Sequence, residues 1–208
     1  MSLLKSYLTV KGHGSHEIEI EKSRFICYVS PAKTEAEAQE FIVDIKKKHW
    51  DANHNCSAYL IGEHNEIQKA NDDGEPSGTA GVPMLEVLKK RDIKDTVVVV
   101  TRYFGGKKLG SGGLIRAYGS SVSEGLNAVG VIERTLVTVV HIKIGYKLLG
   151  KIENAIRNSN YHLEKTSHLE DVEFELWIKV DELDSFKDWM VELTNGSCQI
   201  TESSVKYM

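Results

Sequence analysis

The sequence predicts an α+β protein of two domains, residues 1–135 and 136–208. Its 208 residues exceed the roughly 100 to 150 of a typical single domain. The hydrophobic pattern also changes after residue 135, where the order becomes strand, helix, strand, strand, helix, strand. That order is the split arrangement of a ferredoxin-like domain, so we expect one in the C-terminal part of the chain.

Two periodicities support the C-terminal prediction. Apolar residues alternate at Phe174, Leu176 and Ile178, as in a strand with one buried face. Apolar residues such as Ile152 and Ile156 lie four apart, as on one face of a helix. We expect strands at 136–146, 161–166, 172–180 and 199–205, and helices at 148–157 and 183–193, the second capped by Asp181.

The N-terminal domain mixes both periodicities. Alternation over 17–29 predicts a strand pair or one long bent strand. Thr34 and Glu37 form a capping-box pattern at the start of a helix, which ends in three lysines. We also expect strands at 56–61 and 129–132, and a helix with Val82, Leu85 and Leu88 on its apolar face, capped by Ser77 or Thr79.

The most distinctive stretch runs from four consecutive valines, 97–100, through a glycine-rich loop into a helix with apolar residues at every fourth position. The valines predict a buried strand. Five glycines and two lysines lie within 105–113, which indicates positive φ angles or close approach of another molecule to the backbone. Amide groups at the helix start, together with nearby cations, favour an anion, above all a phosphate. The candidate anion-binding residues are Arg102, Lys107, Lys108, Gly110, Ser111, Gly112, Gly113 and Arg116.

The alternative is a plain tight turn with solvated lysines. The spacing matches neither the dinucleotide fingerprint nor a P-loop, because Gly110 is followed by Ser111 where a P-loop has lysine. Tyr103 and Phe104, just before the loop, are candidates for contact with a ligand.

A second polar loop, residues 71–83, contains the carboxylates Asp72, Asp73 and Glu75. Three carboxylates in four residues could bind a hard cation, but acidic residues next to glycine and proline are commonly turn-formers, so we predict no metal. We expect this loop to lie beside the glycine-rich loop, with its carboxylates orienting Arg102 or Arg116.

His54 and Cys56 are two residues apart and share one face of the predicted strand. A thiol nucleophile or a zinc site would be the chemical interpretation, but the remaining histidines and cysteines lack zinc-ligand spacing. We therefore expect these two residues to be structural, with ligand contact as the next alternative and a nucleophile as the last.

Composition narrows the function classes. The net charge is −4, with 18 basic and 18 acidic residues in 1–135 and 8 basic and 12 acidic residues in 136–208, so sequence-specific DNA binding is not expected. No apolar run approaches the roughly 18 to 20 residues of a membrane span, and no secretory signal pattern is present. Three widely spaced cysteines fit a reducing compartment, so we expect a cytoplasmic protein without a membrane partner. Nothing in the sequence indicates a cofactor.

Three blocks resemble the signature motifs of the IMPACT family, in particular its bacterial YigZ branch. They are HNCSAY at 54–59, DDGEPSGTAGVP at 72–83 and VVVTRYFGGKKLGSGGLIRAY at 98–118. The resemblance implies an N-terminal α/β sandwich similar to a small-subunit ribosomal-protein domain and to domain IV of elongation factor G. It further implies a ferredoxin-like C-terminal domain similar to another domain of that factor. Eukaryotic members regulate translation through a kinase partner system that bacteria lack, so that role is not implied for this chain.

Three functional hypotheses follow. The sequence favours a non-catalytic, translation-associated regulator that binds RNA or the ribosome through the basic glycine-rich loop. The second hypothesis is a protein-interaction module with its own protein partner. The third is a hydrolase that uses Asp72, Asp73 and Glu75, although no linked nucleophile, base and orienting group is apparent.

Overall fold

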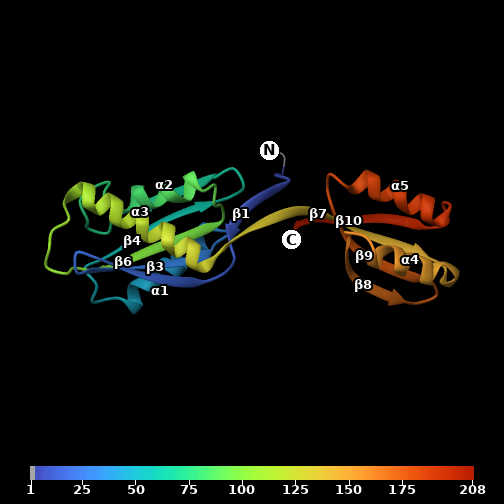
Figure 1. Ribbon diagram of the computed structural model, residues 1–208, viewed down its shortest axis with the longest axis horizontal. Coiled ribbons are helices and arrows are strands. Elements are labelled where there is room, and N and C mark those ends of the chain that lie inside the picture. Colours follow the sequence, from blue (N-terminus) through green and yellow to red (C-terminus); the bar gives the residue numbers. More distant parts are fainter. Residues whose placement is uncertain (1–2) are drawn as a thin grey trace. The chain divides into compact units, whose positions relative to one another are not determined.

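The computed structural model describes residues 3–208, which form two compact units (Figure 1). One unit contains residues 7–133, and the other contains residues 134–208 together with the segment up to Ser6. Within residues 3–208, no helix is long and apolar enough to cross a membrane.

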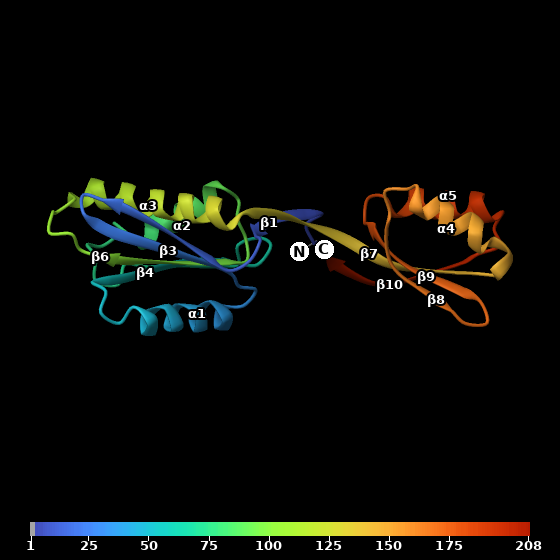
Figure 2. The ribbon, with the colours of Figure 1, turned by 60° about the horizontal axis from the view of Figure 1, so that its bottom comes forward.

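The unit of residues 7–133 is a three-layer structure around a five-stranded antiparallel sheet. Across the sheet the strands are β2 (Gly14–Ile20), β3 (Ser23–Pro31), β6 (Thr96–Tyr103), β4 (His54–Ile61) and β5 (Ile67–Asn71). The helices are α1 (Glu35–Lys48), α2 (Gly81–Lys90) and α3 (Gly110–Val129). Figure 2 shows α1 on one face of the sheet and α2 and α3 on the other.

The central strand β6 shows why this sheet has two covered faces. Val98 and Val100 pack into the core under α2 and α3, whereas Val97 and Val99 pack on the side of α1. All four valines are fully buried. A strand buried on both sides has no polar alternation, which explains the continuous apolar run in its sequence.

The N-terminal elements match the sequence patterns in most places. The alternation over 17–29 is a hairpin of β2 and β3, the strand-pair alternative. Helix α1 begins after Thr34, whose Oγ1 accepts a hydrogen bond from the Glu37 backbone N–H at 3.2 Å, as the capping box predicts. Lys46, Lys47 and Lys48 occupy its last turn.

One prediction for this unit was wrong, and one strand was not predicted. Neither Ser77 nor Thr79 caps α2; the Asp72 carboxylate accepts hydrogen bonds from the backbone N–H groups of Ala80 and Gly81 at 3.1 and 2.8 Å instead. A carboxylate at the beginning of the same loop thus takes the capping role that was expected of Ser77 or Thr79. In addition, β5 was missed, because four of its five residues are exposed and their sequence has no apolar alternation.

The second unit has the expected βαββαβ order. Its elements are β7 (Val131–Ile144), a 3-10 turn (Tyr146–Leu148), α4 (Leu149–Arg157), β8 (His162–His168), β9 (Val172–Lys179), α5 (Leu183–Thr194) and β10 (Gln199–Tyr207). In the sheet, β7 pairs with β9 and β10, β9 also pairs with β8, and β1 (Ser6–Val10) pairs with β7. Phe174, Leu176 and Ile178 are fully buried, as their alternation predicts.

Two boundaries in this region differ from the prediction. The expected strands at 129–132 and 136–146 are one continuous strand, β7, and α3 extends to Val129. Helix α5 has Glu182 rather than Asp181 at its N-cap position, and the Asp181 carboxylate lies 3.9 Å from Lys5 Nζ instead.

Candidate anion-binding site

The start of α3 carries half of the predicted anion-binding residues. Gly110, Ser111, Gly112 and Gly113 form the first turn of this helix rather than the preceding loop. Leu109 occupies the N-cap position and has no capping side chain, no acidic residue lies in the first turn, and no side chain within residues 3–208 is found to accept a hydrogen bond from the amides of 110–113. The backbone N–H groups of that turn therefore lack the protein acceptor that usually satisfies them.

The loop before α3 is held in place by its neighbours. Phe104 N donates a hydrogen bond to Asn53 Oδ1 at 2.7 Å, and Gly105 N donates to Ser23 Oγ at 3.1 Å. A Cβ on Gly105 would lie 2.0 Å from the Lys22 carbonyl group, so only glycine fits there. Gly110 has a φ of +69°, which favours glycine for a conformational reason.

Arg102, near the end of β6, and Glu75, in the acidic loop, form a buried ion pair. Arg102 Nη1 lies 2.6 Å from Glu75 Oε1, and their side chains are only 7% and 3% exposed. The Tyr118 hydroxyl donates a second hydrogen bond to Glu75 Oε1 at 2.7 Å. The guanidinium also lies 5.3 Å from the Phe25 ring and 5.5 Å from the Phe104 ring. Arg102 is thus fixed by charge and by two aromatic neighbours.

One atom of this cluster has no partner. Arg102 Nε is buried and has no hydrogen-bond acceptor among the described residues 3–208, although nearly all such groups in proteins have one. Arg102 lines a cavity of about 380 Å³ at the start of α3, together with Glu75, Pro76, Phe104, Lys108, Leu109, Gly110, Ser111 and Leu114. The cavity therefore combines apolar walls, a helix N-terminus, one lysine and a buried guanidinium whose charge is paired with the Glu75 carboxylate.

The remaining cations occupy different surroundings. Lys107 Nζ lies 2.6 Å from Glu21 Oε2, so its charge is largely compensated. Lys108 is exposed, and no ion pair of it is found within residues 3–208. A neighbouring cavity of about 470 Å³ is lined by both lysines and by Arg116, so Lys108 borders both cavities. Of the predicted cations, Lys108 is best placed to meet an anion at α3.

The three carboxylates of the acidic loop, residues 71–83, have different hydrogen-bond partners. Glu75 accepts a hydrogen bond from Arg102, as expected. Asp72 instead accepts hydrogen bonds from backbone N–H groups at the start of α2, and Asp73 accepts them from Lys46 Nζ at 2.6 Å and from Asn55 N at 2.7 Å. The expectation that all three orient Arg102 or Arg116 was therefore wrong for Asp72 and Asp73, because closer donors take their oxygens. No group of three potential metal ligands occurs within residues 3–208.

His54 and Cys56 lie directly beside this cluster. His54 pairs with Arg102 across β4 and β6, and its Nε2 lies 3.8 Å from Glu75 Oε2. Cys56 Sγ lies 3.0 Å from the Asp72 carbonyl oxygen, to which its thiol can donate, and 3.4 Å from the Tyr118 hydroxyl. Burial raises the pKa of Cys56 to about 12. A thiol so rarely ionised at neutral pH is a poor nucleophile, which supports the structural interpretation.

The side chains of Tyr103 and Phe104 have different surroundings. The Tyr103 hydroxyl lies 2.9 Å from His49 Nδ1 and donates to Asp51 Oδ1 at 3.1 Å, and this residue is not among those lining the cavity at α3. Phe104 lines that cavity and is 46% exposed.

Tyr118 was predicted only as part of the apolar face of α3, yet its hydroxyl belongs to the buried cluster around Glu75. A buried tyrosine needs a hydrogen-bond partner, which was the available signal.

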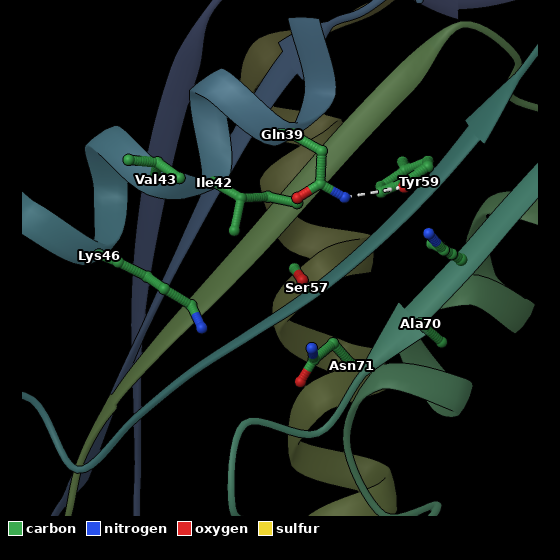
Figure 3. A pocket seen from close by; sticks show the side chains of 9 residues that line it. Gln39, Ile42, Val43, Lys46, Ser57, Tyr59, Ala70 and Asn71 are labelled. Atoms are coloured by element: carbon green, nitrogen blue, oxygen red, sulfur yellow. Dashed lines mark hydrogen bonds between the residues drawn. The ribbon is translucent and has the colours of Figure 1, made fainter. Parts of the chain in front are cut away.

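A further cavity of about 350 Å³ lies on the other face of the sheet, between α1 and the strands β4 and β5 (Figure 3). Lys46 and Gln39 reach toward it from α1, opposite Ser57, Tyr59 and Asn71. Its lysines are already paired, Lys46 with Asp73 and Lys69 with Glu35. This cavity is therefore less suited to an anion than the one at α3.

Each of the two units contains a region that matches a known protein-family model. The family model described as the Impact N-terminal domain matches residues 21–126, and a model described as a domain of unknown function, DUF1949, matches residues 142–197. Fold and motifs together define a two-unit α+β protein with an Impact-type N-terminal domain. The chain belongs to the IMPACT family.

The similarity to bacterial relatives extends beyond the N-terminal domain. "IMPACT family member YvyE" of Bacillus subtilis is 63% identical over 99% of this chain and 95% of its own length. "IMPACT family member YigZ" of Escherichia coli is 37% identical over 69% of this chain and 74% of its own length. A solved structure titled "Crystal structure of an hypothetical protein" matches with a TM-score of 0.62 and 29% identity, covering 97% of this chain and 99% of that chain.

Proposed function

We propose that this protein is a non-catalytic, translation-associated regulator that binds RNA, free or within the ribosome, at the N-terminus of α3. The observation that carries the proposal is the first turn of α3, a helix of 20 residues. This turn contains no acidic residue, and the N-cap residue Leu109 provides no capping side chain. Lys108 lies beside it, and Arg102 lines the same cavity. Backbone N–H groups and a cation at a helix N-terminus form a binding site for phosphate.

Phosphate on a nucleic-acid strand fits this site better than a free mononucleotide. The loop has neither of the glycine patterns that hold nucleotide pyrophosphates, and it offers one uncompensated lysine rather than a closed cradle. Family membership gives a translation context only by analogy. The three free thiols support a cytoplasmic location.

The hydrolase hypothesis loses support from the same geometry. Asp72 and Asp73 hold backbone and lysine donors, Glu75 is engaged by Arg102 and Tyr118, and burial raises the pKa of Cys56 to about 12. These groups stabilise the fold of the loops, so we assign them positioning roles.

The proposal is tested by the salt dependence of RNA binding. Fluorescence anisotropy with a labelled RNA decamer between 50 and 200 mM KCl gives the slope of log K against log salt. Each lost phosphate contact should reduce that slope by about 0.7 for a single strand. We expect this reduction for Lys108→Gln and none for Lys147→Gln, an exposed lysine of the other unit. An unchanged slope in Lys108→Gln would remove this site from the interface.

A further inference from the structure

We propose that the cavity at the start of α3 binds one unpaired base of an RNA strand, while the phosphate of that nucleotide contacts the first turn of the helix. This inference rests on the proposed function, because it assumes that the strand reaches α3. The inference adds the type of RNA to the proposed function, because it predicts that the protein binds single-stranded RNA in preference to double-stranded RNA.

The cavity is lined by both apolar and polar residues, including the paired Glu75 and Arg102. Pro76, Phe104, Leu109 and Leu114 supply apolar surface. Lys108, Gly110 and Ser111 supply a cation and the helix start. A nucleotide also has two kinds of surface, a flat base at one end and a charged phosphate at the other. The volume of about 380 Å³ falls within the range of roughly 300 to 1,000 Å³ found for small-ligand sites.

Phe104 is the residue that fits a base. Its ring is 46% exposed, although it stands at the edge of a cavity and not in a core cluster. Its backbone is fixed by Asn53, and the Arg102 guanidinium lies 5.5 Å from its ring centre. A half-exposed aromatic ring that is held rigidly beside a phosphate site is the arrangement on which proteins stack the bases of single strands.

Arg102 contributes a fixed cation to the wall of the cavity. The residue is only 6% exposed and lines the cavity, while its Nε is buried and has no acceptor within residues 3–208. Arg102 Nη1 donates a hydrogen bond to Glu75 Oε1 at 2.6 Å, which holds the guanidinium 5.5 Å from the centre of the Phe104 ring. A cation at this distance from an aromatic ring helps to hold the ring in place.

Duplex RNA does not fit this arrangement. Its bases are paired and stacked within the helix, so none is free to enter a cavity beside α3. Proteins that read bases in RNA therefore act on loops, bulges and single strands. The backbone of a duplex can still reach Lys108 and the start of α3. A preference for single-stranded over double-stranded RNA would therefore come from the base contact alone.

The experiment compares a single-stranded RNA decamer with a duplex of the same length, using anisotropy at several salt concentrations. We expect wild type to prefer the single strand, and Phe104→Leu to weaken single-strand binding about tenfold, because stacking on an aromatic ring is lost. The salt slope of Phe104→Leu should equal that of wild type, since a base contact releases no counterion. Phe104→Trp should retain the affinity. Tyr146→Leu, which replaces a ring of similar exposure in the other unit, is the matched control.

The outcomes separate the two proposals. Equal binding of both RNAs, with no loss in Phe104→Leu, would overturn the base site while a slope change in Lys108→Gln preserved the phosphate site. Absence of binding to either RNA would overturn both. A loss in Phe104→Leu that Phe104→Trp shares would also contradict stacking, since it would indicate a shape requirement. Urea midpoints of each variant equal to wild type exclude unfolding as the cause.

Discussion

Glu75 and Arg102 form an ion pair that is almost completely removed from water. Removing one partner of such a pair leaves a buried charge without compensation, which destabilises by about 3–5 kcal/mol. We expect this loss in the free energy of unfolding for Glu75→Ala, measured by urea denaturation at pH 7. The Tyr118 hydroxyl would lose its acceptor in the same variant.

Lys107→Ala is the matched comparison, because it breaks an exposed pair with Glu21 and should change stability by no more than about 0.5 kcal/mol. Glu75→Gln combined with Arg102→Met removes both charges and should recover part of the loss. Equal effects of Glu75→Ala and Lys107→Ala would show that the pair at the cavity contributes little.

The three thiols differ in their access to solvent. Cys27 and Cys56 are buried, and burial raises the pKa of each to about 12, whereas Cys198 is partly exposed. Alkylation requires an accessible thiolate. Iodoacetamide at pH 8 should therefore modify Cys198 first, with Cys27 and Cys56 reacting only in urea, as followed by mass spectrometry. Rapid native alkylation of Cys56 would reopen the nucleophile hypothesis.

Helix α2 depends on a carboxylate outside it. The Asp72 side chain accepts hydrogen bonds from the backbone N–H groups of Gly78, Ala80 and Gly81 at 2.8, 3.1 and 2.8 Å. Loss of a capping side chain typically costs up to about 2 kcal/mol. We expect a loss of this size for Asp72→Ala in urea denaturation at pH 7.

This contribution should depend on pH. Burial opposes ionisation of Asp72, but the three N–H groups outweigh it and lower the pKa of the carboxyl. A group with a lowered folded pKa stabilises the protein above its unfolded pKa of about 3.9, and this stabilisation is lost as the pH falls through the folded value. The difference between wild type and Asp72→Ala should thus be smaller at pH 3 than at pH 7. A constant difference would mean that the charge is unimportant.

Elements with strong internal periodicity could be predicted from the sequence, whereas elements defined by distant partners could not. Helix α1 carries its own cap in Thr34, so its start was predictable. Helix α2 is capped by Asp72, eight and nine residues before the groups it binds, and a local pattern cannot show that. Strand β5 is recognisable only through its pairing with β4.

The candidate site was also predictable only where it depends on local sequence patterns and not on distant partners. Residue types marked the glycine-rich loop, and opposite charge suggested a neighbour for Arg102. The choice of Glu75 over Asp72 and Asp73 depends on which donors each oxygen meets in the folded chain. The separation of Tyr103 from Phe104 depends on where β6 ends, at Tyr103.

At the scale of the whole molecule, the net charge of −4 gives no general attraction to RNA. Association with ribosomes would have to come from a local site rather than from overall charge. We expect the protein to co-sediment with ribosomes through a sucrose gradient at 50 mM KCl and to be released at 500 mM. Lys108→Glu should abolish the co-sedimentation, whereas Lys147→Glu should not. Retention of Lys108→Glu would indicate another contact surface.

The sheet of residues 7–133 is assembled from two hairpins, β2–β3 and β4–β5, and β6 is the strand that lies between them. During synthesis the chain therefore carries two separate hairpins, each only marginally stable in water, until β6 has been made. A chain truncated after Asp95 should show little amide protection in hydrogen exchange, whereas one that includes β6 and α3 should be protected throughout the sheet. The timing of folding is then set by one central strand, whose neighbours in the sheet have already been synthesised when it appears.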